Sequence, residues 1–131
     1  MADLRTPSFD AVMALLKGSS TLQAFLGTPA RVYDQRPSMA TFPYLTMNLS
    51  EVRDVSAKGL SIESGILQID IWSRQRGSRE VTQLLAALRS VLHDATLPNI
   101  ARCMEEFSSV LWDDEAQMSH GVARYRVVMA G

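Results

Sequence analysis

The chain has 131 residues, of which 47% are hydrophobic and 21% are charged. This length suits one domain with its own core, expected over residues 1–131, and the composition excludes a disordered or low-complexity chain. The formal net charge is -1, which excludes a general electrostatic attraction to nucleic acid or to an anionic membrane. Cys103 is the single cysteine, so no intrachain disulfide can form. The chain opens without a basic, apolar leader and has no apolar run long enough to cross a bilayer, so we expect neither secretion nor a membrane anchor.

The N-terminal part of the chain is expected to be mainly helical. A first helix should run from Thr6, whose hydroxyl can accept an amide at the cap, to Gly18. A short second helix follows, capped by Ser19 or Ser20 and closed by a glycine and a proline. Residues 31–33 then offer a brief strand.

Two strands of period two form the most informative feature of the sequence. In residues 44–49 and 66–72 every second side chain is apolar and should face a core, while the opposite face carries polar side chains together with Tyr44 and Trp72. The polar stretch from Ser50 to Ser64 joins them. This pattern predicts a long hairpin whose polar end is free to contact a partner.

A helix and two more strands complete the expected fold. Ser78 should cap an amphipathic helix whose apolar stripe runs from Val81 to Leu92 and covers the sheet. Residues 102–112 form a third long strand with mixed alternation, residues 123–129 form the last strand, and residues 113–121 hold the turn between them. The sequence thus predicts an α+β fold with an antiparallel or mixed sheet of about four to five strands, helices packed on one face and a long extended β-hairpin.

The residue types that carry chemistry are sparse. His93 falls in the last turn of a helix, where a dipole interaction is the simplest role, and His120 is expected in an exposed turn. The adjacent acids Asp113, Asp114 and Glu115 could gather a cation but lack the alternating spacing of a calcium loop, so a solvated turn is favoured. Cys103 has no neighbouring histidine and is expected to be a packed, unreactive side chain.

Enzyme and nucleotide sites are equally poorly supported. Glu63 and Asp70 resemble the paired acids of a magnesium nuclease only faintly, because no lysine follows Asp70 at short range. No glycine-rich phosphate loop is present. We therefore expect no catalytic residue, no metal, no cofactor and no enzymatic activity.

Two groups of basic residues have alternative interpretations. Arg74, Arg76 and Arg79 surround a glycine and could bind phosphate or an acidic partner, or could simply form a solvated turn. Arg124 and Arg126 share one strand face, where they are expected to pair with Asp70 or Glu105, with a subunit contact as the alternative.

Several segments in a fixed order resemble a known family. They are the strand start Phe42-Pro43-Tyr44, the polar hairpin through Arg53-Asp54, the strand end Ile69-Asp70-Ile71-Trp72-Ser73, and the capped amphipathic helix that follows. This arrangement resembles the phage tail terminators, which are the tail completion or head-tail joining proteins of long-tailed phages, prophages and gene transfer agents. The similarity runs from about Val32 to the terminal strand. The family has no catalytic residues, so none is carried over.

The resemblance implies a structural virion protein at the head-proximal end of the tail, assembled in the cytoplasm of a bacterial host. Such a subunit forms a ring, usually a hexamer, that ends growth of the tail tube and joins the head. The implied partners are further copies of the chain, the tail tube protein and the head-tail connector protein, with DNA only as passing cargo. The alternatives are a connector or tail tube subunit and, less favoured, a small hydrolase or ligand-binding domain.

Two sets of residues are expected to serve such an assembly. The expected subunit or tube interface consists of Tyr44, Glu51, Arg53, Asp54, Lys58, Glu63, Asp70, Trp72, Arg74, Arg76, Arg124 and Arg126. The acids Asp113, Asp114 and Glu115 are candidates for lining the channel, because like charge would keep the duplex from adhering to the wall.

Overall fold

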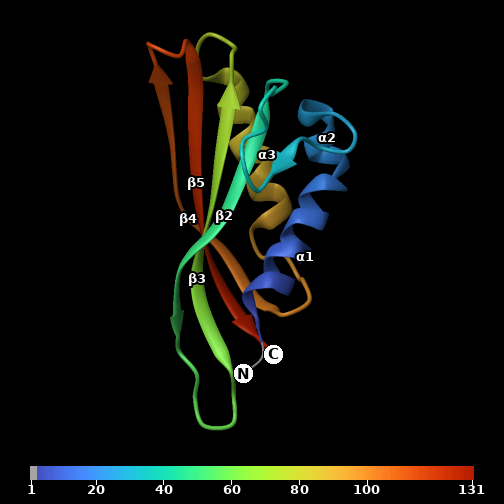
Figure 1. Ribbon diagram of the computed structural model, residues 1–131, viewed down its shortest axis with the longest axis vertical. Helices are drawn as coiled ribbons and strands as arrows, with labels where there is room; N and C mark the ends of the chain where they lie inside the picture. The colour runs from blue at the N-terminus through green and yellow to red at the C-terminus, as the bar shows by residue number, and fades with distance from the viewer. Residues whose placement is uncertain (1–2) are drawn as a thin grey trace.

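Five strands form one mixed sheet in the order β1-β2-β3-β5-β4, as the computed structural model shows for residues 3–131 (Figure 1). The strands are β1 (Val32–Tyr33), β2 (Tyr44–Asp54), β3 (Ile62–Ser73), β4 (Ile100–Asp113) and β5 (Met118–Ala130), and the helices are α1 (Arg5–Lys17), α2 (Ser20–Leu26) and α3 (Arg79–Leu92). β1 is parallel to β2, and every other neighbouring pair is antiparallel. The predicted α+β class is confirmed.

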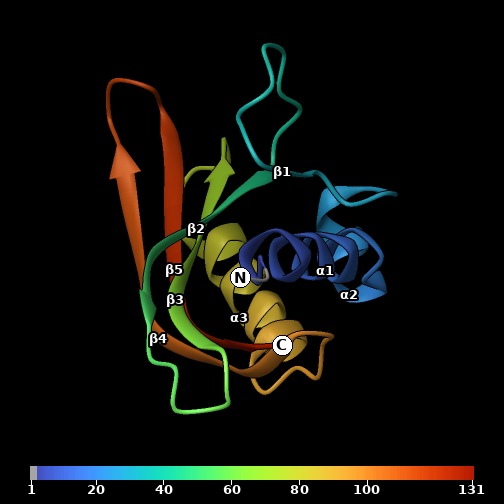
Figure 2. The same ribbon diagram turned by 60° about the horizontal axis from the view of Figure 1, so that its bottom comes forward.

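All three helices cover the same face of the sheet, and Figure 2 shows the opposite face bare. The side chains that meet in this layer are the apolar half of each strand and the stripe of α3. Leu84, Leu88 and Leu92 of α3 are fully buried, as are Ile69 and Ile71 of β3. Because only this face is buried, apolar and polar residues alternate in the sequences of β2, β3 and β5.

The β2–β3 hairpin is longer than its apolar alternation indicated. β2 continues to Asp54 and β3 begins at Ile62, and the pairing includes Arg53 with Ser64. Polar residues do not prevent this extension, because strand pairing uses backbone groups. Figure 1 shows the hairpin projecting beyond the helices at the lower end of the molecule.

Two register shifts in β4 explain its mixed alternation. They fall between Ile100 and Arg102 and between Glu105 and Phe107. Each bulge adds one residue to β4 without a partner in β5, so a strict period of two cannot persist in the sequence.

The turn between β4 and β5 is much shorter than predicted. β5 begins at Met118, so Ser119, His120 and Gly121 lie in a strand, and their assignment to a turn was wrong. Gly121 faces α3, where an added Cβ would lie 2.5 Å from Cγ1 of Val81. Glycine here permits close packing of helix on strand, which a single sequence does not distinguish from a turn glycine.

The helix caps are partly as predicted. The Ser19 side chain accepts the Leu22 amide at 3.3 Å, as expected for α2. Thr6 is not the cap of α1, because the carboxylate of Asp3 accepts the amides of residues 5 and 6 instead. Ser78 makes no side-chain cap bond for α3, where Gln75 Oε1 accepts the Glu80 amide at 3.1 Å. Acceptors one turn upstream have replaced both predicted caps.

The segment after α3 closes the lower part of the β4 edge. The Asp94 amide donates to the Cys103 carbonyl at 2.8 Å, and the Glu105 amide donates to Nδ1 of His93 at 3.2 Å. His93 is the C-cap of α3 and thus occupies the helix end, where its backbone amide bonds Arg89. Among residues 3–131 no helix has the length and apolar character needed to cross a bilayer.

Candidate interaction surface

Trp72 and His120 form the centre of the helix-free face of the sheet. Their rings stack with centroids 3.9 Å apart and planes 6° from parallel, and Trp72 Nε1 donates to the Thr46 hydroxyl at 3.3 Å. His120 Nε2 lies 3.0 Å from Oδ1 of Asp70. His120 is therefore a half-buried, fixed side chain, and its expected exposure was wrong.

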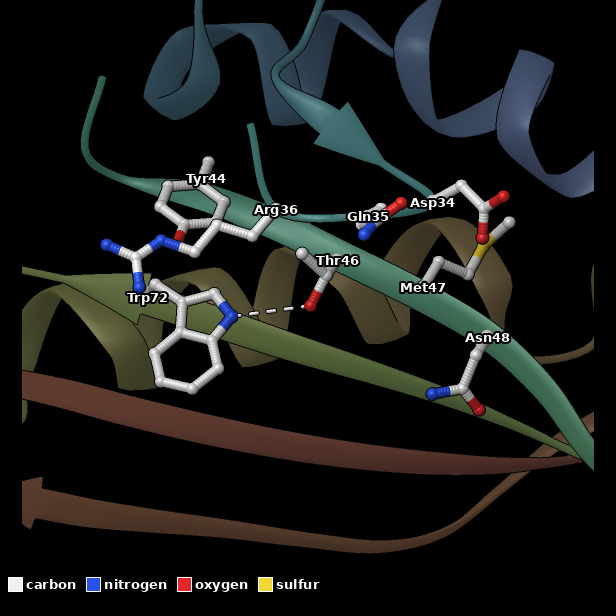
Figure 3. Close-up of a pocket in the computed structure, with 8 residues that line it drawn as sticks. All are labelled: Asp34, Gln35, Arg36, Tyr44, Thr46, Met47, Asn48 and Trp72. Carbon is white, nitrogen blue, oxygen red and sulfur yellow. Dashed lines mark hydrogen bonds between the residues drawn. The ribbon is translucent and has the colours of Figure 1, made fainter. Parts of the chain in front are cut away.

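A shallow hollow of about 280 Å³ lies beside this stack (Figure 3). Its wall includes Arg36, Tyr44 and Trp72, which Figure 3 shows close together at one end. Tyr44 was expected to be an exposed aromatic anchor, but it is only 1% exposed, packed against the rings of Tyr33 and Phe42. Burial raises the pKa of its hydroxyl.

Two ion pairs cross the same bare face nearer the hairpin. Arg124 pairs with Glu51, and Arg126 pairs with Glu106 at 3.1 Å and also donates to Ser64 at 3.3 Å. The predicted partners were wrong, because Asp70 is engaged by His120 and Glu105 pairs with Arg89 of α3 at 2.9 Å. Both actual partners lie at register shifts of their strands, which sequence spacing alone does not reveal.

The tip of the β2–β3 hairpin combines charged and apolar side chains. Arg53, Asp54 and Lys58 are exposed there, and so are Val55 at 47% and Leu60 at 59%. The Ser56 amide donates to Asp54 at 2.8 Å, and hydrogen bonding by Ser56 lowers the pKa of that carboxyl.

Glu63, further along the same hairpin, is half-buried. Its carboxylate lies 3.5 Å from the guanidinium of Arg5 in α1. The hairpin is therefore tied to the body of the molecule just before its tip, at the pair of Asp54 and Glu63, while residues 55–61 project beyond this tie.

The end of the sheet opposite the hairpin tip carries most of the remaining candidates. Arg74 lies over the Phe42 ring at 4.5 Å, and Arg76 is exposed in the turn before α3. The acids of the β4–β5 turn are exposed, with Asp113 accepting the Ala116 amide at 3.1 Å and Asp114 accepting Trp112 Nε1 at 2.9 Å. Glu115, the third acid of this turn, is exposed as well.

Exposed apolar side chains mark surfaces that sequence reasoning missed. Phe107 and Leu111 of β4 are 52% and 56% exposed, Trp112 is 40% exposed, and Met39 in the loop before β2 is 91% exposed. Large apolar side chains at the edge of a sheet and on projecting loops are typical of contact surfaces. The weak alternation of β4 was the available signal, because its two bulges break the period of the strand, although its lower part packs in the core through Ile100 and Cys103.

Within residues 3–131 no three His, Cys, Asp or Glu side chains come together in a way that could hold a metal ion. Cys103 is buried, as expected, and burial raises the pKa of its thiol to about 11. The predicted interface residues instead fall on three surfaces, which are the bare sheet face, the hairpin tip and the opposite end of the sheet.

Comparison with known proteins identifies the family. A solved structure described as the virion of a native gene transfer agent particle matches with a TM-score of 0.83 at 20% sequence identity, covering 97% of this chain and 96% of that chain. Among proteins with curated descriptions, none matches the sequence. The family model described as tail completion protein gp17 matches residues 10–130. The chain therefore belongs to the gp17 family of tail completion proteins, which makes it a structural protein of the phage tail type.

Proposed function

We propose that the protein forms a ring on the head-proximal end of a tail tube, ends elongation of the tube and provides the surface that joins the head. The single observation that carries this function is the position of the exposed apolar side chains. They lie on the β2–β3 hairpin tip, on the β4 edge and on the loop before β2, and not around one enclosed pocket. Such a distribution suits a subunit with several neighbours.

A closed ring requires each subunit to offer two different lateral surfaces, because a head-to-tail contact joins unlike patches. The sheet has two unlike edges that meet this requirement, β4 on one side and β1 with the lower part of β2 on the other. The hairpin tip is a third surface and lies at one end of the strands, so in a ring with upright strands it would face along the axis (Figure 1).

The tail tube is the proposed partner of the hairpin tip. Val55 and Leu60 would bury apolar area against the tube, while Arg53, Asp54 and Lys58 surround them with polar groups. An apolar centre within a charged rim is the usual anatomy of a protein interface. The opposite end of the ring, with the β4–β5 turn, then faces the head-tail connector.

The test uses purified tail tubes and the full chain. The wild type should form rings in electron images, cap one end of each tube and stop its growth in an elongation assay. The double variant Val55→Ser, Leu60→Ser should bind tubes at least about tenfold more weakly, because each buried aliphatic side chain contributes about 1.5–3 kcal/mol. Ala14→Ser, which changes an exposed apolar side chain on α1 away from the proposed contact surfaces, is the matched control.

Tubes that continue to grow at normal rates in excess wild-type protein would refute the terminator function. Equal tube affinity of the wild type and the double variant would refute the role of the hairpin tip. Stacking of the protein into long tubes of its own would identify a tube subunit instead.

A further inference from the structure

The outer edge of β4 is closed in its lower part and free in its upper part. His93 and Asp94 bond the edge at Glu105 and Cys103, whereas from Phe107 to Asp113 no described residue donates or accepts a backbone hydrogen bond on that side. Free strand edges are templates for another strand. The exposed side chains of Phe107 and Leu111 lie on this same segment, which we name the upper β4 edge.

The opposite border of the sheet has a free strand at the same height. The pairing registers connect one row across the whole sheet, and its members are Val32, Leu45, Ile71, Gly121 and Val110. β1 pairs only with β2, and no strand of the same copy pairs with its other side, although the Val32 amide already donates to the Ala30 carbonyl at 2.9 Å. In copies related by rotation about an axis along the strands, the upper β4 edge of one copy would therefore meet β1 and the Asp34–Pro43 loop of the next.

The strand directions are compatible with this contact. β2 is antiparallel to β3, β3 to β5 and β5 to β4, so β4 runs opposite to β2 and also to β1, which is parallel to β2. A neighbouring copy in the same orientation thus brings β4 antiparallel to β1. Antiparallel pairing is the more stable arrangement per residue and needs no inversion of the subunit.

The charges of the two borders are opposite. Asp114 and Glu115 are exposed at the end of the upper β4 edge. Near the β1 border, Arg36 is exposed beside Tyr44 in the loop that also carries Asp34 (Figure 3). Arg74, directly after β3, lies 4.5 Å over the ring of Phe42 in the same loop. Within residues 3–131 neither Asp114 and Glu115 nor the two arginines belong to an ion pair. Complementary potentials at two unlike patches select a head-to-tail contact and disfavour like-to-like pairing.

We propose that the upper β4 edge docks a second copy of this chain along its β1 border, with Asp114 and Glu115 against the neighbour's Arg36 and Arg74. This proposal rests on the proposed ring, and it assigns the acids of the β4–β5 turn to a subunit contact in place of the channel wall. Phe107 and Leu111 supply the apolar part of the same contact.

The test is an exchange of charge between two variants. The first carries Asp114→Lys and Glu115→Lys, and the second carries Arg36→Glu and Arg74→Glu. Asp113 is kept because its carboxylate accepts the Ala116 amide in the turn. Each variant alone presents like charges at every subunit contact and should lose about tenfold or more of its ring yield in mass photometry and electron images.

An equimolar mixture of the two variants should restore rings with alternating subunits. In the mixture the introduced lysines of one variant face the introduced glutamates of the other, and the unchanged acids of the second face the unchanged arginines of the first. A ring of alternating variants can close when its number of subunits is even. Restoration also shows that both variants fold. A control with Asp10→Lys and Lys17→Glu on α1 changes the same number of charges elsewhere and should form rings alone.

The outcomes separate the two proposals. Rings of the wild type together with normal rings of each charge variant alone would overturn the assigned contact and leave the ring intact. Failure of the mixture to recover rings would also overturn it. Absence of wild-type rings in the presence of tail tubes would overturn the proposed function itself.

Discussion

Replacement of Gly121 by alanine tests the closest approach between α3 and the sheet. A Cβ on residue 121 would lie 2.5 Å from Cγ1 of Val81 and 3.3 Å from Cβ of Ile71. Ordinary carbon contacts are about 3.5–4.0 Å. The helix or the strand must therefore shift by about 1 Å, and overpacking of this kind costs about 1–3 kcal/mol.

The same structure predicts which second substitution relieves the strain. Val81→Ala removes the contacting methyl group from a fully buried side chain and should alone cost about 1.5–3 kcal/mol. In the double variant the alanine methyl at residue 121 enters the space that valine has left. We expect the double variant to lose at least about 1 kcal/mol less free energy of unfolding than the sum of the losses in the two single variants.

Urea unfolding followed by circular dichroism measures the four free energies of this cycle. With a slope of about 1–3 kcal/mol per molar urea, the predicted changes move the midpoint by roughly 1 M. Val91→Ala, ten residues further along α3, is the matched control and should add to Gly121→Ala without coupling. Strict additivity of Gly121→Ala and Val81→Ala would refute the steric account of this glycine.

Three further predictions concern other surfaces. Phe107→Asp should abolish the proposed subunit rings while changing the free energy of unfolding by less than about 0.5 kcal/mol, because the Phe107 side chain is half exposed. A loss of stability in urea well above this value would count against a role in assembly alone. Arg126→Met should cost less than about 1 kcal/mol, since its pair with Glu106 is solvent-accessible, and a larger loss would mean that the pair is a structural element. Burial raises the pKa of the Cys103 thiol from 9.0 to about 11, so the folded state keeps a proton that the unfolded chain loses. The stability that this neutral thiol contributes is fully present below about pH 9 and is lost as pH rises to about 11, so Cys103→Ala should flatten the decline in urea titrations over this range, and an unchanged slope would contradict the assignment.

The sequence predicted best where one face of an element is buried. α3 and the apolar halves of β2, β3 and β5 have a regular period because the sheet and the helix layer cover a single face of each. The same reasoning located the projecting hairpin, since a polar stretch between two such strands has no core to enter.

Side chains on the bare sheet face were predicted less well. Tyr44 alternates with core residues and was assigned to solvent, yet the segment from Tyr33 to Phe42 folds back over its ring. His120 was assigned to a turn because Ser119 and Gly121, on either side of it, are residue types that are common in turns. In both cases a segment distant in sequence decides whether the side chain is exposed, and the periodicity of the local sequence carries no information about that segment.

The free part of β4 could not be located from the sequence either. Its lower edge is closed by two groups that follow α3, and its upper edge is open, although the residues of both parts are similarly polar. The bulge at Glu106 separates the two parts and also obscures the alternation. Whether a strand edge is available depends on hydrogen bonds from elsewhere in the chain.

The bond between His93 and the β4 backbone has a consequence for fidelity. An incoming strand cannot slide along the whole length of β4, because its path ends where the imidazole and the Asp94 amide already occupy the groups it would need. For the proposed contact, pairing shifted toward the lower end, which would let copies add as a staggered, open fibre, is thereby disfavoured. In the proposed ring, these two groups beyond the end of α3 would therefore act as a physical stop against a shift of the contact toward the lower end of β4.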